Sequence, residues 1–299
     1  MPLTYTPRKR FSPQEYAQAI LAGDRIMLSR AITLIESKLP SDVALAEKVL
    51  EIILPHTGNS LRVGITGVPG VGKSTFIESF GKLITGMGKK LAVLTIDPSS
   101  QRSKGSILGD KTRMESLAND PMAYIRPSAS GATLGGVNNK TRETMLLCEA
   151  AGYEVILIET VGVGQSETTV AEIADFFLLL MLAGAGDELQ GIKKGIMEMA
   201  DALVITKADG DNVTMSQMAA REYANAMRLF PAQDSGWEPE VLTCSSVEQR
   251  GLDTVWDVIV RHHELMCQTG YFQAKRMEQN IAWMNEIIDY YLKYDFLHA

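Results

Sequence analysis

A glycine-rich motif constrains this chain more than any other feature of its sequence. It matches the pattern G-x-x-x-x-G-K-[ST], and its residues are Gly67, Val68, Pro69, Gly70, Val71, Gly72, Lys73 and Ser74. An apolar run over residues 61–66 precedes the motif and an amphipathic stretch follows it. In this context such a loop surrounds phosphate groups with backbone N–H donors at a helix N-terminus. The motif therefore predicts a nucleoside triphosphate site between a strand and a helix.

The residues that end this motif have roles that follow from their chemistry. The ammonium group of Lys73 can reach the β- and γ-phosphate oxygens, and the hydroxyl of Ser74 suits Mg²⁺ as a ligand. Thr75, the next residue, is expected beside the α-phosphate. We therefore expect a complex of Mg²⁺ and nucleotide at residues 67–75.

Short apolar runs alternate with longer amphipathic stretches in much of the chain, which is typical of parallel strands joined by helices. We expect strands near residues 61–66, 91–96, 155–158, 176–182, 202–206 and 240–243. The predicted fold class is α/β, with a mostly parallel, doubly wound sheet of the P-loop nucleoside triphosphatase type. Ligands on such sheets bind beyond the carboxyl ends of the strands.

Helical patterns flank the predicted sheet domain. Residues 1–58 are interpreted as an N-terminal helical extension, in which residues 12–15 carry a helix-start signal with Pro at the first position. Residues 59–250 are the predicted P-loop domain, and residues 251–299 are predicted to form C-terminal helices.

The composition excludes several classes of partner. The net charge is −7 at pH 7, whereas nucleic-acid binding relies on an excess of clustered Lys and Arg. The longest apolar run, residues 176–185, is shorter than the roughly 20 residues that cross a bilayer. Cys148, Cys244 and Cys267 are far apart and odd in number, which favours reduced thiols. We expect a cytoplasmic protein without a nucleic-acid or membrane partner.

A second motif follows the apolar run at residues 202–206 and predicts the choice of base. Thr206-Lys207-Ala208-Asp209 resembles the N-K-x-D guanine-binding motif, whose carboxylate accepts hydrogen bonds from the N1–H and 2-amino groups. Adenine lacks this pair of donors, so Asp209 favours GTP over ATP. The Lys207 stem can pack along the base. The Asn that usually begins this motif ties the loop to the phosphate loop. Thr206 stands in its place here, so we expect a less rigid loop.

Residues after three other predicted strands complete the expected site. Glu159 follows residues 155–158, at the place where GTPases carry an acidic residue that senses the γ-phosphate. Asp97 and Asp110 are further carboxylates suited to holding Mg²⁺ or its waters. The loop expected to contact the guanine oxygen consists of Cys244, Ser245 and Ser246.

Several longer segments resemble one family of P-loop GTPases. Residues 97–100, 105–113, 159–167 and 189–195 are similar to segments of the MeaB/ArgK family, which belongs to the SIMIBI class and includes methylmalonic aciduria type A-like proteins. The resemblance covers roughly residues 12–270.

This resemblance implies a GTP-hydrolysing chaperone that protects and reloads the adenosylcobalamin-dependent methylmalonyl-CoA mutase. It implies nucleotide-sensitive loops near residues 101–113, 159–167 and 184–193. By the same resemblance Asp97, Asp110 and Glu159 manage Mg²⁺ and water.

The resemblance further implies that Lys193 stabilises charge on the transferred phosphoryl group. The adjacent Lys194 is a second candidate for that role on the sequence alone. A homodimer built by a C-terminal helical arm is also implied, although family members extend further than this chain, which stops at Ala299.

Three alternative functions remain open at this point. An older family label suggests an arginine/ornithine transport kinase, but an ATP-dependent small-molecule kinase does not need the carboxylate of Asp209. A nickel-type metallochaperone GTPase would need a Cys/His cluster, and the four His residues share no ligand spacing with each other or with Cys. A binding module that the nucleotide only locks in one state is the third alternative.

Overall fold

The computed structural model describes residues 10–96, 114–127, 134–160, 166–184, 194–231 and 233–298. Three residues of the predicted site, Asp97, Asp110 and Lys193, lie outside these ranges.

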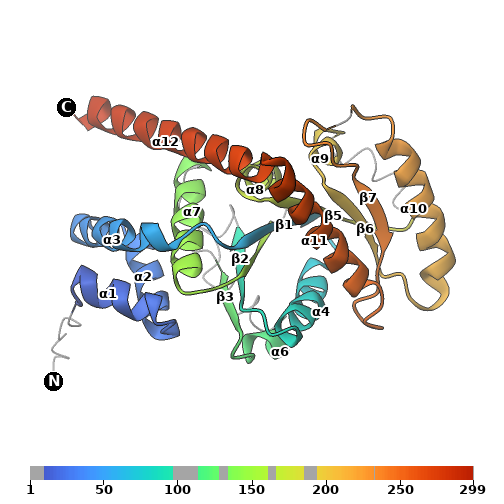
Figure 1. The fold of residues 1–299 in the computed structure, drawn as a ribbon, viewed down its shortest axis with the longest axis horizontal. Helices are drawn as coiled ribbons and strands as arrows, with labels where there is room; N and C mark the ends of the chain where they lie inside the picture. Colours follow the sequence, from blue (N-terminus) through green and yellow to red (C-terminus); the bar gives the residue numbers. More distant parts are fainter. Residues whose placement is uncertain are drawn as a thin grey trace, which may run out of the picture.

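A parallel sheet forms the centre of the molecule (Figure 1). Within the described ranges it has seven strands in the order β3-β2-β4-β1-β5-β6-β7, and every neighbouring pair is parallel. The strands are β1 (Leu61–Gly67), β2 (Leu91–Ile96), β3 (Ala123–Pro127), β4 (Val155–Thr160), β5 (Phe176–Leu182), β6 (Ala202–Thr206) and β7 (Glu240–Thr243). The predicted α/β class and parallel sheet are confirmed.

One strand was not predicted. β3 pairs with β2 at the edge of the sheet and has only a short apolar stretch, followed by Arg126 and Pro127. An edge strand needs fewer apolar residues than a central strand and tolerates Pro, so its sequence resembles a loop. The other six strands fall at the predicted residues. Five of them are buried by helices on both faces, which makes their sequences mostly apolar, whereas β7 at the opposite edge is only half-buried.

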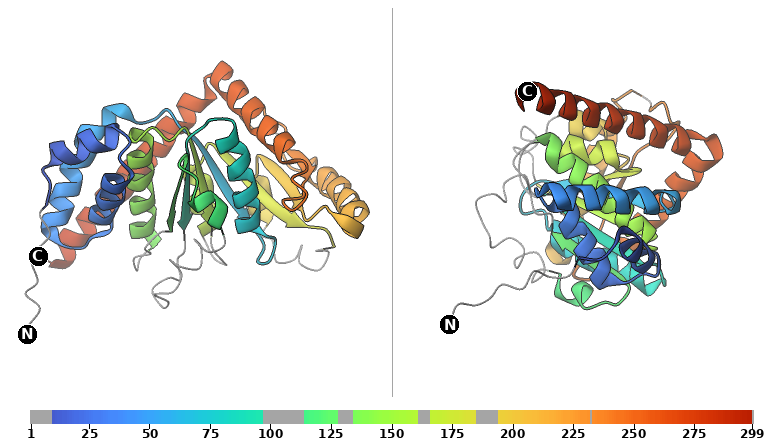
Figure 2. Two further views of the ribbon diagram at one scale, coloured as in Figure 1. Left: turned by 90° about the horizontal axis from the view of Figure 1, so that it is seen from below. Right: turned by 90° about the vertical axis from the view of Figure 1, so that its left-hand side faces the viewer.

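Helices cover both faces of the sheet (Figure 2). One face packs against α4 (Lys73–Gly86), α6 (Glu115–Ala118) and α11 (Leu252–Thr269). The other face packs against α7 (Leu134–Ala150), α8 (Ser166–Ile173), α9 (Lys194–Glu198) and α10 (Val213–Met227). Short 3-10 turns lie at Leu54–His56 and Gly210–Asn212. None of the helices in the described ranges is long and apolar enough to cross a membrane.

The N-terminal helices α1 (Pro13–Leu21), α2 (Arg25–Glu36) and α3 (Pro40–Ile53) form a further layer outside α7 (Figure 1). α1 begins with a capping box, as predicted. The Glu15 N–H donates to the Ser12 hydroxyl at 3.2 Å, and the Ser12 N–H donates to the Glu15 carboxylate at 2.7 Å.

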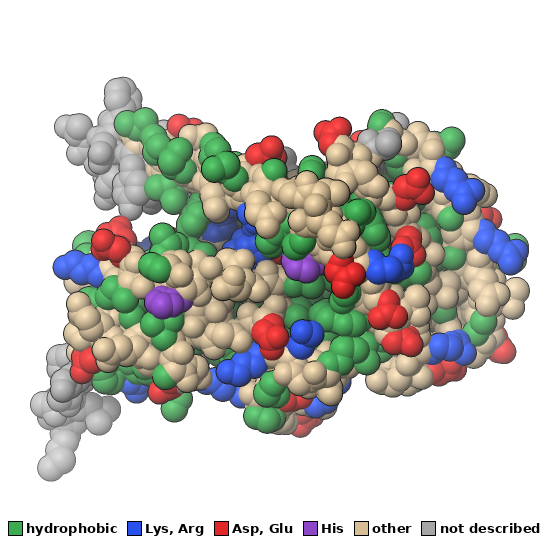
Figure 3. Space-filling view, in the orientation of Figure 1, with side chains coloured by type: hydrophobic (Ala, Val, Ile, Leu, Met, Phe, Trp, Pro, Cys, Tyr) green, Lys and Arg blue, Asp and Glu red, His purple; other side chains and the backbone are tan. Residues whose placement is uncertain are grey.

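The last helix, α12 (Tyr271–His298), runs across the outside of α7. The guanidinium of Arg142 donates to the Gln279 carbonyl at 3.1 Å and lies 5.9 Å from the centre of the Trp283 ring. These contacts hold α12 against α7. An exposed apolar stripe follows one side of the helix and consists of Met277, Ile281, Met284, Ile288 and Leu292 (Figure 3).

A buried ionic network joins α12 to the amino-terminal end of β1. The Arg276 guanidinium donates to the Asp175 carboxylate at 2.7 Å and to the Ser60 carbonyl at 2.9 Å. The same carboxylate accepts the backbone N–H of Arg62 at 2.8 Å, and the Arg62 side chain pairs with the fully buried carboxylate of Glu149. The network therefore fixes α12 at the end of the sheet opposite the carboxyl ends of the strands.

Replacing Arg276 tests this role. Arg276→Ala leaves the buried carboxylate of Asp175 without its cation, and we expect a loss of about 3 kcal/mol in the free energy of unfolding. The matched control is Arg261→Ala, because Arg261 forms an exposed ion pair with Glu240 and should contribute less than about 1 kcal/mol. Urea unfolding followed by circular dichroism measures both. Equal losses in the two variants would contradict the proposed role of the network.

Candidate functional site

The predicted site residues that the structure describes lie at the carboxyl ends of β1, β4, β6 and β7. β1 lies beside β4, whereas β5 separates β1 from β6. Gly67 and Glu159 therefore come from neighbouring strands of this edge, and Lys207 follows the second strand on the other side of β1. Ligands of open parallel sheets bind at such an edge. The edge also carries the start of α4, whose first N–H groups favour an anion.

Two glycines allow the phosphate loop to form. A Cβ on Gly67 would lie 2.4 Å from the carbonyl oxygen of Leu180 in β5, so only glycine permits this approach. Gly72 has a φ of 91° and is the N-cap of α4, a conformation that disfavours other residues. Val71 is fully buried, whereas Pro69, Gly70 and Thr75 are exposed. The loop is therefore anchored through Val71 and open to solvent at Pro69, Gly70 and Thr75.

Lys73 lies over this loop. Its amine donates to the Gly67 carbonyl at 2.7 Å and to the Val68 carbonyl at 3.4 Å. Burial lowers the pKa of Lys73, while the carboxylates of Glu159 and Glu167 act in the opposite direction. A partly desolvated ammonium group interacts strongly with phosphate oxygens.

Ser74 and Glu159 lie together beside the phosphate loop. The Ser74 hydroxyl donates to the Glu159 carboxylate at 3.4 Å, and Glu159 is buried at the end of β4. A hydroxyl and a carboxylate are both oxygen ligands of the kind that Mg²⁺ prefers, so this pair fits a magnesium site. Asp97 and Asp110, the other predicted metal-binding residues, lie outside the described residues.

Thr206 links the loop of the predicted guanine motif, residues 206–209 (the base-recognition loop), to the phosphate loop, residues 67–75. Its buried hydroxyl donates to the Val71 carbonyl at 2.7 Å and lies 3.2 Å from the Met181 carbonyl. The Lys207 amine adds a second link, donating to the Gly70 carbonyl at 2.8 Å. The replacement of the usual Asn by Thr206 predicts a less rigid loop. The Thr206 hydroxyl nevertheless makes the hydrogen bond that connects this loop to the phosphate loop.

The loop at residues 244–246 packs against the base-recognition loop. The Ala208 N–H donates to the Cys244 carbonyl at 3.0 Å, and the Ser245 hydroxyl donates to the Asp209 carboxylate at 2.6 Å. On the other side, the Ser79 hydroxyl of α4 donates to the Ser246 carbonyl at 3.0 Å. The structure thus brings Cys244, Ser245 and Ser246 to the same place as Asp209.

Burial raises the pKa of Cys244 to about 12, and the nearby Asp209 adds to this shift. The Cys244 thiol therefore stays protonated at neutral pH and acts here as a buried packing group.

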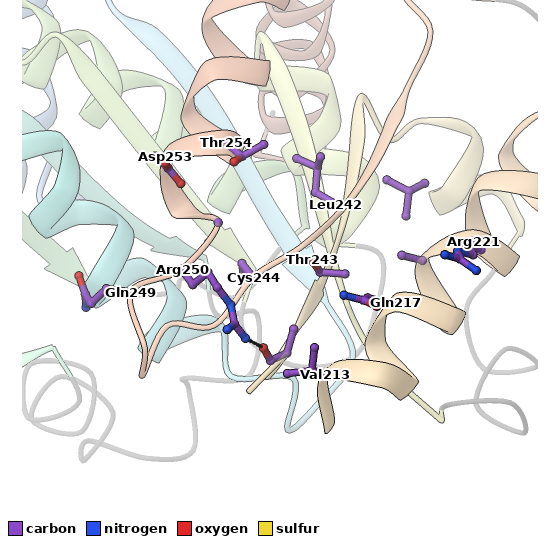
Figure 4. A pocket seen from close by; sticks show the side chains of 14 residues that line it. Val213, Gln217, Arg221, Leu242, Thr243, Cys244, Gln249, Arg250, Asp253 and Thr254 are labelled. Carbon is purple, nitrogen blue, oxygen red and sulfur yellow. Dashed lines mark hydrogen bonds between the residues drawn. The ribbon is translucent and has the colours of Figure 1, made fainter. Parts of the chain in front are cut away.

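A groove of about 920 Å³ adjoins this region, between α10, β7 and the start of α11 (Figure 4). Ala208 and Cys244 line it, whereas the described residues of the phosphate loop do not. The groove therefore adjoins the base-recognition loop without reaching the described residues of the phosphate loop.

The link made by Thr206 generates a prediction. Thr206→Val keeps the size of the side chain but leaves the Val71 carbonyl without its donor, so we expect a loss of about 1–3 kcal/mol in the free energy of unfolding. We also expect weaker GDP binding, because both nucleotide loops lose their connection. Thr206→Ser keeps the hydroxyl and is the matched control. Thermal unfolding and GDP titration measure both effects, and a Thr206→Val protein equal to wild type in both would refute this role.

Comparison with known proteins agrees with this geometry. Residues 28–297 match the family described as methylmalonyl Co-A mutase-associated GTPase MeaB. The chain is 48% identical over 272 residues to GTPase ArgK of Escherichia coli, covering 91% of this chain and 82% of that protein. It is 46% identical over 290 residues to the mitochondrial methylmalonic aciduria type A homolog of Mus musculus, covering 94% and 70%.

A solved structure, the crystal structure of an LAO/AO transport system kinase, superimposes with a TM-score of 0.80. It is 41% identical in sequence, and the match covers 94% of this chain and 84% of that one. The phosphate loop, the linked base-recognition loop and these matches together assign the chain to the MeaB family of P-loop GTPases.

Proposed function

We propose that this GTPase requires Mg²⁺ and acts as a chaperone for an adenosylcobalamin-dependent mutase, namely methylmalonyl-CoA mutase. The observation that supports GTP binding is the hydrogen bond from the Thr206 hydroxyl to the Val71 carbonyl. This bond connects the phosphate loop directly to the segment that leads to Asp209. The mutase is supported by the family's description as mutase-associated and by the name of the mouse relative. We place this activity in the cytoplasm.

The proposed roles of Lys73, Ser74 and Glu159 follow from the positions of their side chains, and those of Asp97, Asp110 and Lys193 rest on the family resemblance. Lys73 binds the β- and γ-phosphates, and Ser74 and Glu159 hold the metal together with Asp97 and Asp110. When bound, Mg²⁺ would neutralise charge that develops on the phosphate oxygens. Lys193 stabilises the same charge.

The base is recognised by a separate set of groups. Asp209 accepts both guanine donors, the Lys207 stem packs along the ring, and the backbone of residues 244–246 faces the guanine oxygen. Gly67, Val68, Pro69, Gly70, Val71, Gly72 and Thr75 surround the phosphates in this proposal.

We also propose that the protein forms a homodimer through α12. The exposed stripe from Met277 to Leu292 presents five apolar side chains on one side of a long helix. A second copy of the helix would remove this surface from water.

Asp209→Asn tests the assignment of the base. The amide replaces one acceptor by a donor, so it no longer matches the two donors of guanine but suits xanthine, which has a carbonyl at position 2. We expect GTP affinity to fall, by up to about 10⁴-fold, and XTP affinity to rise. Competition binding measures both. If the variant kept its GTP preference, or wild type bound ATP equally well, the small-molecule kinase alternative would regain support.

A second experiment tests the client and Lys193 together. Purified adenosylcobalamin-dependent methylmalonyl-CoA mutase is added to the GTPase, and GTP turnover is expected to change when the two bind. Lys193→Ala should lower the turnover of the complex by about 10²-fold with little change in GTP affinity, because its charge acts on the transition state. Lys194→Ala is the matched control and should behave as wild type. Turnover that never responds to the mutase would contradict the chaperone role.

A further inference from the structure

Arg250 lies where the base-recognition loop, residues 206–209, meets the loop at residues 244–250. Its backbone closes the loop at residues 245–250, since its N–H donates to the Ser245 carbonyl at 3.0 Å and its carbonyl accepts the Ser245 N–H at 2.9 Å. Its guanidinium reaches across to the other loop and donates to the Ala208 carbonyl at 2.5 Å (Figure 4). One residue therefore contacts both loops.

The Ala208 carbonyl belongs to the peptide group that leads into Asp209. The N–H of Ala208 is already fixed, because it donates to the Cys244 carbonyl. With Arg250 holding the carbonyl, Ala208 is bonded on both sides, and the direction in which the Asp209 side chain leaves the backbone is set.

The backbone of Arg250 acts on the same carboxylate from the other side. Ser245 donates its hydroxyl to the Asp209 carboxylate, and the paired backbone of Ser245 and Arg250 fixes where this hydroxyl lies. The two routes from Arg250 thus converge on the orientation of Asp209.

The conformation of the base-recognition loop depends on side-chain links of this kind. Lys207 has a φ of 55°, which is unfavourable for a residue with a Cβ. Its carbonyl is held by the side-chain amide of Asn212 at 2.7 Å. A loop in such a conformation needs external hydrogen bonds to remain in one geometry.

We propose that Arg250 is a positioning residue for base recognition, which orients the Asp209 carboxylate toward the two donors of guanine. The inference rests on the proposed role of Asp209 and adds a residue that acts on it through the Ala208 carbonyl and the backbone of Ser245. The Arg250 side chain is 56% exposed, and its other partner is the exposed Glu248 at 3.1 Å. Such a surface pair contributes little to stability, so the main consequence of losing Arg250 is a change in base preference.

The test compares base preference in four variants. Unlabelled GDP or ADP displaces a fluorescent GDP analogue from wild type, Arg250→Ala, Arg250→Lys, Arg261→Ala and Asp209→Asn. We expect the Kd for GDP to rise about tenfold in Arg250→Ala, while the Kd for ADP stays unchanged because adenine does not use Asp209. Arg250→Lys should recover part of the preference, since its amine can reach the same carbonyl. Arg261 forms a similarly exposed ion pair, so Arg261→Ala should match wild type.

Other outcomes overturn the proposal in distinguishable ways. If Asp209→Asn lowers the preference for GDP over ADP but Arg250→Ala does not, Arg250 has no positioning role. If Arg250→Ala weakens GDP and ADP equally and lowers the melting temperature, its role is structural only. If neither variant changes the preference, the assignment of Asp209 fails, and this proposal fails with it.

Discussion

The hydrogen bond from the Thr206 hydroxyl to the Val71 carbonyl is the contact on which the geometry of the site depends. It joins the loop after β1 to the last residue of β6, although β5 lies between these strands in the sheet. Val71 is fully buried, so this carbonyl has little access to water as an alternative partner. This buried hydrogen bond therefore fixes the distance between the proposed phosphate site and the proposed base site.

The two ends of the sheet carry different kinds of groups. The carboxyl ends of the strands carry the glycine loop, Glu159 and the base-recognition loop, which expose backbone and polar groups. The opposite end is closed by ion pairs between Arg276, Asp175, Arg62 and Glu149. Because these charges are buried, they anchor α12 at a fixed place on the sheet. The loops that we propose bind nucleotide therefore lie at the end of the sheet opposite these ion pairs.

Local sequence predicts much of this arrangement because the relevant signals lie within short segments. The glycine motif placed the turn between β1 and α4, and apolar runs placed six of the seven strands in the described ranges. β3 was missed because its position at the edge permits Arg126 and Pro127. The links from Arg250 to Ala208 and from Ser245 to Asp209 join residues far apart in the chain, and no local pattern predicts such contacts.

The central claim is that a guanine nucleotide lies across both loops, with its phosphates at Lys73 and its base at Asp209. A crystal structure of the protein with Mg²⁺ and a non-hydrolysable GTP analogue tests this claim most directly. The account predicts that the Asp209 carboxylate lies about 3 Å from both N1 and the 2-amino group of guanine. It also predicts that the Lys73 amine leaves the Gly67 carbonyl for the β- and γ-phosphate oxygens. A base turned away from Asp209, or phosphates bound outside residues 67–75, would contradict it.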